Sequence, residues 1–255
     1  MRKIVALWLL VTALCLGACN QDALVAKFTP HPEAEMAKRA IDDWREGRIA
    51  ELRAMLAPSV QSEVTDAQFA TWAAEFPKGE PRSVKVVGAS TFVHSGEHRY
   101  DLTYEYEFDG KWLVASAVVV RHGDEEAKIE GIQAKLLDRS LEQINAFTFQ
   151  NKGGLHLLML FLSVASPLVS IAALIVCIRT PMRRRKVLWA LFTLVGVSTV
   201  HFNWTTGQSS FMPISFQIFG ASAVSTPYGP WMLGVSLPLG AIVFFLRRKA
   251  LMVRQ

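Results

Sequence analysis

Residues 99–121 read RYDLTYEYEFDGKWLVASAVVVR. In the first half of this stretch polar and apolar residues alternate, and a period of two predicts a half-buried strand with one wet face. The apolar positions are Tyr100, Leu102, Tyr104, Tyr106 and Phe108. Asp109-Gly110 then favours a tight hairpin turn. Residues 113–120 are apolar on both faces, which indicates a second strand at a central position in the sheet.

The segments around this hairpin complete a domain. Residues 84–93 and 128–136 have strand-like patterns, so we expect a sheet of about four antiparallel strands. Before the sheet, residues 32–44 and 49–56 have apolar residues at helical spacing. Thr65-Asp66-Ala67-Gln68 fits a capping box at the start of a further helix. The sequence therefore predicts an α+β domain over residues 30–136, in which two or three helices precede the strands.

This element order, together with Asp109-Gly110-Lys111-Trp112, resembles the nuclear transport factor 2 and ketosteroid isomerase group. The resemblance implies a cone-shaped α+β fold, similar to that of cystatin, with a mouth that can hold a ligand. It implies no particular activity, because that fold carries enzymes, binding modules and inert scaffolds alike.

The amino terminus has the pattern of an export signal. Arg2 and Lys3 precede a short apolar run over residues 4–16, which small residues close. Leu16-Gly17-Ala18-Cys19 resembles the bacterial lipobox. That resemblance implies cleavage between Ala18 and Cys19, lipid attachment to Cys19 and acylation, as with palmitate, of the new amino terminus. We expect residues 1–18 to be a lipoprotein signal peptide and 19–29 a lipidated linker; the alternative is an ordinary signal or uncleaved anchor with a chance cysteine.

Charge is distributed unevenly along the chain. The net charge is +5, yet all 22 acidic residues lie between Asp22 and Glu142. Residues 151–255 contain ten basic residues and no acidic ones. The part that folds in water is therefore acidic and would repel phosphates, which argues against nucleic acid as a partner.

The carboxy-terminal part is predicted to be an all-α membrane domain. Three apolar runs, 155–178, 187–204 and 228–246, are long enough to be transmembrane helices. Residues 137–154 would be a linker, and 205–227 a loop. Within that loop, 211–224 is uncharged and apolar, so re-entrant, interfacial and fourth-span interpretations all remain open.

The positive-inside rule assigns an orientation to these spans. Basic residues gather in the loop 179–186 and in the tail 247–255, and we take them as topology determinants. They are Arg183, Arg184, Arg185, Lys186, Arg247, Arg248 and Lys249. We expect a bacterial inner-membrane protein with its amino-terminal domain and the loop 205–227 in the periplasm and its carboxy terminus in the cytoplasm. Asn203-Trp204-Thr205-Thr206-Gly207 and Tyr228-Gly229-Pro230-Trp231 are similar to stretches of bacterial inner-membrane proteins of unassigned function, a resemblance that implies no activity.

Candidate binding residues are few. Tyr100, Tyr104 and Tyr106 either line the mouth of the cone and bind an apolar ligand or pack the core. Asp101 is a candidate base beside them, but its odd spacing from His98 places the two on opposite faces of a strand. His94 and His98 fit no metal-ligand spacing. We expect no catalytic, cofactor-binding or metal-binding residues.

Three functions remain open. The first is a binding or scaffolding module close to the inner membrane, with the lipid bilayer and either an envelope protein or a second copy as partners. The second is an enzyme that uses the cone as a dry pocket, with Asp101 or a histidine as base and a tyrosine as oxyanion donor. The third is a structural subunit of a membrane complex that acts through its three helices.

Overall fold

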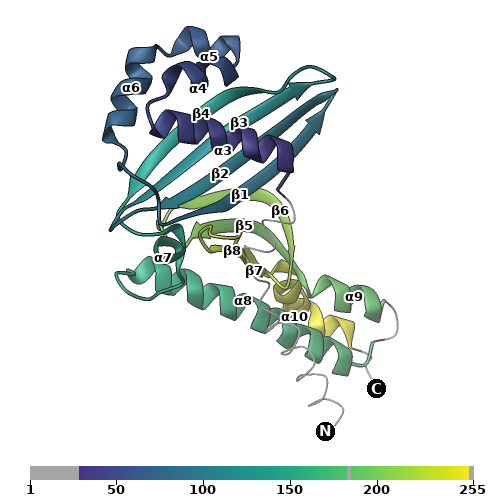
Figure 1. The fold of residues 1–255 in the computed structure, drawn as a ribbon. Coiled ribbons are helices and arrows are strands. Elements are labelled where there is room, and N and C mark those ends of the chain that lie inside the picture. The colour runs from purple at the N-terminus through teal and green to yellow at the C-terminus, as the bar shows by residue number, and fades with distance from the viewer. Residues whose placement is uncertain (1–28, 183–184, 253–255) are drawn as a thin grey trace, which may run out of the picture. The chain divides into compact units, whose positions relative to one another are not determined.

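The computed structural model describes residues 29–182 and 185–252, and the chain divides into two compact units, Met1–Leu141 and Glu142–Gln255 (Figure 1). We call them the N-terminal unit and the C-terminal unit. The predicted signal peptide, the lipid attachment at Cys19 with its cleavage site after Ala18, and the topology determinants Arg183 and Arg184 lie outside the described residues.

The N-terminal unit is built on a meander of four antiparallel strands in the order β1-β2-β3-β4. The strands are β1 (Ser83–His94), β2 (Glu97–Glu107), β3 (Trp112–His122) and β4 (Lys128–Leu137). Because β3 pairs with both β2 and β4, the predicted central position of residues 113–120 is confirmed. The predicted turn is present too: Gly110 has φ +72°, and the Phe108 amide donates to the Lys111 carbonyl.

From residue 29 onward, four helices precede this sheet. They are α3 (His31–Arg45), α4 (Ile49–Met55), α5 (Pro58–Glu63) and α6 (Asp66–Glu75). Helix α3 lies across one face of the sheet (Figure 1) and buries Ala37, Ala40, Ile41 and Trp44. The predicted capping box at Thr65 is confirmed, whereas α5, which begins at Pro58, was not predicted. The α+β prediction is therefore confirmed for this unit.

The C-terminal unit contains a second antiparallel sheet, in the order β6-β5-β8-β7. Its strands are β5 (Val195–Asn203), β6 (Ser209–Ile218), β7 (Ala221–Val224) and β8 (Met232–Leu237). Its helices are α7 (Leu141–Asn145, which begins at the last residue of the N-terminal unit), α8 (Gly154–Arg179), α9 (Lys186–Phe192) and α10 (Leu239–Leu251). The long helix α8 packs against β7, β8, α9 and α10.

The prediction of an all-α membrane domain with three transmembrane helices is wrong. Among the described residues only α8, which has 26 residues and a mean hydropathy of 2.5 over an 18-residue window, is long and apolar enough to cross a membrane. The run 187–204 instead forms most of α9 and all of β5, and 228–246 forms β8 and part of α10. Residues 205–227, expected to be a loop, hold β6 and β7.

The physical reason is that hydropathy does not distinguish a buried strand from a membrane helix. The run 187–204 contains a cluster of β-branched residues that favours extended backbone, namely Val195, Val197, Thr199 and Val200. In the run 228–246, Pro238 lies between β8 and α10 and interrupts any continuous helix.

Candidate ligand-binding cavity

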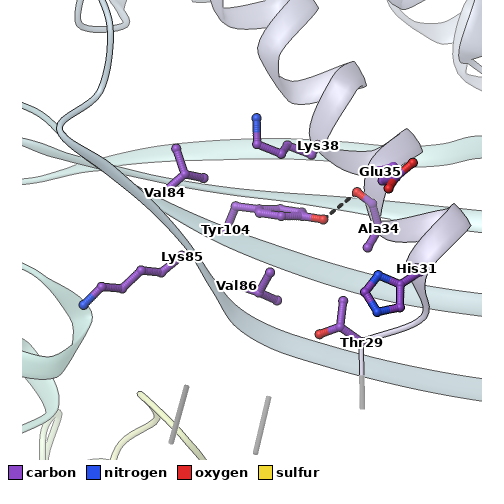
Figure 2. Close-up of a pocket in the computed structure, with 9 residues that line it drawn as sticks. All are labelled: Thr29, His31, Ala34, Glu35, Lys38, Val84, Lys85, Val86 and Tyr104. Atoms are coloured by element: carbon purple, nitrogen blue, oxygen red, sulfur yellow. Dashed lines mark hydrogen bonds between the residues drawn. The ribbon is translucent and has the colours of Figure 1, made fainter. Parts of the chain in front are cut away.

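A cavity of 420 Å³ lies between the amino-terminal half of α3 and strands β1 and β2 of the N-terminal unit (Figure 2). Its walls are mostly apolar, and its polar groups come from the helix and from the edge strand. The lining residues are Thr29, His31, Ala34, Glu35, Lys38, Val84, Lys85, Val86 and Tyr104. A cavity of this size and lining can hold a small apolar molecule and offers few polar groups to orient it.

Strand register places the walls of the cavity. In the β1–β2 pairing, Val86 lies opposite Tyr104 and Val84 lies opposite Tyr106. Side chains directly opposite each other point to the same face of a sheet, and here this is the face that α3 covers. The alternation that predicts strand β2 therefore also gives the cavity its aromatic wall.

Tyr104 is held firmly in that wall. Its hydroxyl donates a 2.6 Å hydrogen bond to the carbonyl of Ala34 in the first turns of α3 (Figure 2). The side chain is buried, and burial raises the pKa of Tyr104 to about 12. The phenol therefore stays protonated at neutral pH and remains a hydrogen-bond donor.

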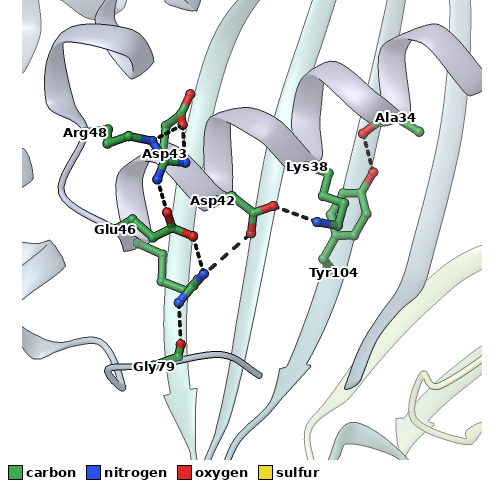
Figure 3. Close-up of polar contacts among 9 residues, drawn as sticks. Ala34, Lys38, Asp42, Asp43, Glu46, Arg48, Gly79 and Tyr104 are labelled. Atoms are coloured by element: carbon green, nitrogen blue, oxygen red, sulfur yellow. Dashed lines mark hydrogen bonds and ion pairs between the residues drawn. The ribbon is translucent and has the colours of Figure 1, made fainter. Parts of the chain in front are cut away.

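A charged network along α3 adjoins the cavity (Figure 3). Lys38 forms an ion pair of 2.6 Å with Asp42, one turn further along the helix. Arg45, whose side chain is nearly buried, pairs with Glu46 and donates to the carbonyl of Gly79. The network ties the end of α3 to the loop that leads into the sheet, and it leaves Lys38 at the cavity rim with a carboxylate partner.

Tyr106 and Tyr100 lie outside the lining of this cavity. Tyr106 is fully buried, and its hydroxyl has no hydrogen-bond partner within the part of the chain that the structure describes. Burial, with the nearby Asp42 carboxylate, raises the pKa of Tyr106. Tyr100 accepts a 3.3 Å hydrogen bond from Arg121, which also pairs with the buried Glu33. Burial is the main reason that the pKa of Tyr100 is raised, and Glu33 adds to it.

The remaining candidates lie outside the lining of the cavity. Asp101 alternates with Tyr100 and Leu102 along β2, so it lies on the opposite face of the sheet, where it pairs with Arg99 at 2.9 Å. His94 is exposed at the end of β1, and His98 stacks beside Tyr100. The described residues contain no group of three or more metal-binding side chains. Of the four predicted pocket residues, only Tyr104 lines the cavity.

Comparisons of this chain with protein-family models, with curated proteins and with solved structures find no match. Several lining residues were missed by the sequence analysis, chiefly Lys38, Val84 and Val86. The two valines lie in a correctly predicted strand, but only the β1–β2 register places them beside Tyr104. Lys38 has the appearance of an ordinary solvated helix residue in the sequence.

Proposed function

We propose that the protein is a bacterial inner-membrane lipoprotein whose N-terminal unit binds a small, largely apolar molecule close to the bilayer. The observation that carries the binding role is the 420 Å³ cavity, whose walls are Ala34, Val84, Val86 and Tyr104. The helices followed by a four-stranded meander support a likeness to the cone-shaped nuclear transport factor 2 and ketosteroid isomerase group. In this proposal Cys19 carries the lipid, and the N-terminal unit lies in the periplasm.

Helix α8 supports the membrane location. Its 26 residues span about 39 Å at 1.5 Å per residue, more than the roughly 30 Å of a hydrocarbon core. Apolar side chains are exposed along its length, among them Leu158, Phe161, Leu168 and Ile175. A water-soluble monomer rarely leaves so much apolar surface uncovered, so a single span is the simplest role for this helix.

The two ends of α8 differ in a way that favours an orientation with the carboxy-terminal end in the cytoplasm. At its carboxy-terminal end, Arg248 of α10 donates to Thr180, which brings the basic end of α10 beside Arg179. At the amino-terminal end, Lys152 donates to the carbonyl of Trp204, whose ring stacks on Phe147 at 4.5 Å. Basic residues gather on the cytoplasmic side of a membrane, and aromatic residues gather at its interfaces. We therefore assign the carboxy-terminal end of α8 to the cytoplasm and its amino-terminal end to the periplasmic interface.

The alternative functions have less support. The enzyme alternative assigned the base to Asp101 or a histidine beside a tyrosine. Asp101 lies on the opposite face of the sheet from Tyr104, and His94 and His98 are outside the cavity lining, in which the histidine is His31. A complex subunit that acts through three membrane helices is not proposed, because only α8 among the described residues is long and apolar enough to cross.

A cavity-filling variant tests the binding role. The full chain in lipid nanodiscs would be screened by thermal shift against small apolar and amphiphilic molecules. We expect a subset to raise the unfolding midpoint of the native protein and of Val93→Trp, an exposed site at the far end of the same strand, but not of Val86→Trp. The binding role is wrong if no molecule raises the midpoint, or if Val86→Trp responds as the native protein does.

A further inference from the structure

Strand β6 presents an unusual surface, which we call the β6 apolar surface. It consists of large apolar side chains that are exposed on both sides of the strand. They are Phe211, Met212, Ile214, Phe216, Ile218 and Phe219. Ile214 is 89% exposed and Phe216 78%, so most of the surface of each residue is uncovered. An exposed cluster of this kind in a folded protein marks a contact with another apolar phase or partner.

The stretch of sequence that contains this surface has no charged side chains. Residues 187–246 contain no Asp, Glu, Lys or Arg, although they include most of α9, four strands with their turns and the first part of α10. Surfaces that face water normally carry charged side chains, which keep the folded protein soluble. A charged rim, as expected around a protein-binding patch, is therefore missing from this part of the sequence.

Two backbone carbonyls beside the β6 apolar surface accept hydrogen bonds from the chain's own hydroxyl groups. The β5–β6 register shifts here, so that residues 213–215 bulge over Ser198, which has φ +55°. Ser198 donates to the carbonyl of Pro213 at 2.8 Å, and Ser215 lies 3.3 Å from the carbonyl of Met212, to which it donates. Water satisfies such bulge carbonyls without help from side chains, whereas hydrocarbon cannot.

Polar side chains within the sheet also bond to one another. The Thr199 hydroxyl lies 2.7 Å from that of Ser215 and 2.8 Å from that of Ser236. Ser236 continues the chain to Gln217, whose amide donates to Ser222 at 2.6 Å. The network is uncharged and links all four strands, an arrangement suited to a medium of low dielectric constant.

The free edge of β6 is unsuited to pairing with a strand from another chain. Pro213 has no amide hydrogen to donate, and the bulge at 213–215 bends the strand. Prolines and bulges are devices that protect sheet edges from further strands. The side chains of β6, rather than its edge, are therefore the part available for contact.

We propose that the β6 apolar surface inserts its side chains into the bilayer from the interfacial region and forms a second membrane contact in addition to α8. The open edge of β6 stays at the level of the headgroups, where water and headgroups satisfy its amides and carbonyls. This inference rests on the proposed membrane location but not on the proposed ligand cavity. It makes the C-terminal unit an α+β structure that contacts the bilayer surface, in which the bulge at 213–215 carries Ile214 into the lipid.

Site-specific labelling of the full chain tests this contact. Ile214→Cys and the control Val93→Cys, both in a Cys177→Ala background, would be labelled with the fluorophore NBD and reconstituted into vesicles of phosphatidylcholine and phosphatidylglycerol. Val93 is a matched control because it is also an exposed apolar strand residue, 63% exposed in the N-terminal unit. Cys177→Ala alone, carried through labelling, measures label at Cys15 or Cys19.

We expect NBD at position 214 to be quenched several-fold more by nitroxide-labelled lipids than by aqueous iodide, and the reverse at position 93. Quenching by iodide at both positions overturns the inference, and so does protection of position 214 from both quenchers, which would mean that protein covers β6. Extraction of the vesicles with alkaline carbonate separates the two proposals: if the protein stays bound while position 214 reports water, only the β6 contact fails, and if the protein is released, the membrane location fails as well.

Discussion

Tyr104 and Tyr106 lie two residues apart on the same face of β2, yet their hydroxyl groups have opposite environments. The Tyr104 hydroxyl is bonded to Ala34 across the helix–sheet interface, whereas the buried Tyr106 hydroxyl has no such partner among the described residues. A buried hydroxyl stabilises the fold only when it is hydrogen-bonded, since otherwise its desolvation is uncompensated. Removing the hydroxyl by a Tyr→Phe substitution at each position therefore compares a hydrogen-bonded hydroxyl with one that has no such partner.

We predict that Tyr104→Phe lowers the free energy of unfolding by about 1 kcal/mol, the usual net value of a lost hydrogen bond, whereas Tyr106→Phe leaves it unchanged or raises it. Urea unfolding of both variants and the native chain in nanodiscs, followed by near-ultraviolet circular dichroism, measures the difference. Equal losses in the two variants would contradict the hydrogen-bond assignment, because the two changes remove the same atom from equally buried rings.

The candidate site could be predicted from the sequence only at single positions. Alternation along β2 identified Tyr104 as inward-facing, and it also placed Tyr100 and Tyr106 inside. It could not decide which of the three would border open space, because that depends on where α3 crosses the sheet. Asp101 lies an odd number of residues from both His98 and Tyr104. Alternation along β2 therefore places it on the opposite face of the sheet from both.

Helix α6 is the element whose start was predicted most closely. The amide of Gln68 donates to the Thr65 hydroxyl at 3.3 Å, and the amide of Thr65 donates to the Gln68 side chain at 2.9 Å. The box satisfies two amides that would otherwise lack partners at the start of the helix. It also fixes the position at which Phe69 enters the core against Trp44, 5.7 Å between ring centres.

We predict that Thr65→Ala destabilises the N-terminal unit by about 1 kcal/mol, the typical cost of losing a helix cap. Thr71→Ala is the control, because Thr71 is exposed in the middle of α6, where alanine is the better helix former. Thermal unfolding of the two variants beside the native chain checks the prediction. A Thr71→Ala variant as unstable as Thr65→Ala would show that the hydroxyl at the cap has no special role.

The elements that were predicted correctly have strong local signals, and those predicted wrongly do not. The β2–β3 hairpin combines alternation with Asp109-Gly110, so period and turn agree. Residues 187–246 are uncharged and largely apolar, so their strands and helices have similar hydropathy, and the lengths of the apolar runs matched a membrane span. The decisive interactions there are the hydroxyl contacts of Thr199 and Ser236 between strands, which have no signature in the sequence.

The two units differ in the surface that each presents. In the N-terminal unit, the exposed large apolar side chains among residues 29–141 are Trp72, Phe92 and Val93, whereas the C-terminal unit exposes them on every helix from α8 to α10 and along β6. The N-terminal unit also has its own core around Ile41, Leu102 and Ile129. The exposed large apolar side chains therefore lie mainly on the C-terminal unit.

We predict that a fragment of residues 29–141 is monomeric and unfolds cooperatively in buffer without detergent. The fragment 142–255 is expected to require detergent or lipid, because water would contact its exposed apolar residues. Size-exclusion chromatography and thermal circular dichroism of the two fragments measure this directly. Aggregation of 29–141, or a non-cooperative melt, would mean that its core depends on the C-terminal unit.

The uncharged stretch 187–246 also has a consequence for biosynthesis. During translation of this stretch, the residues of β5 are synthesised first. Strand β8, which pairs with β5 on the side opposite β6, follows only some thirty residues later. Until β8 is made, β5 is an apolar segment that is unpaired on that side, and no charged residues flank it to oppose aggregation in water. In the proposed membrane location, insertion of α8 during synthesis would shelter β5 from water while the second sheet is still incomplete.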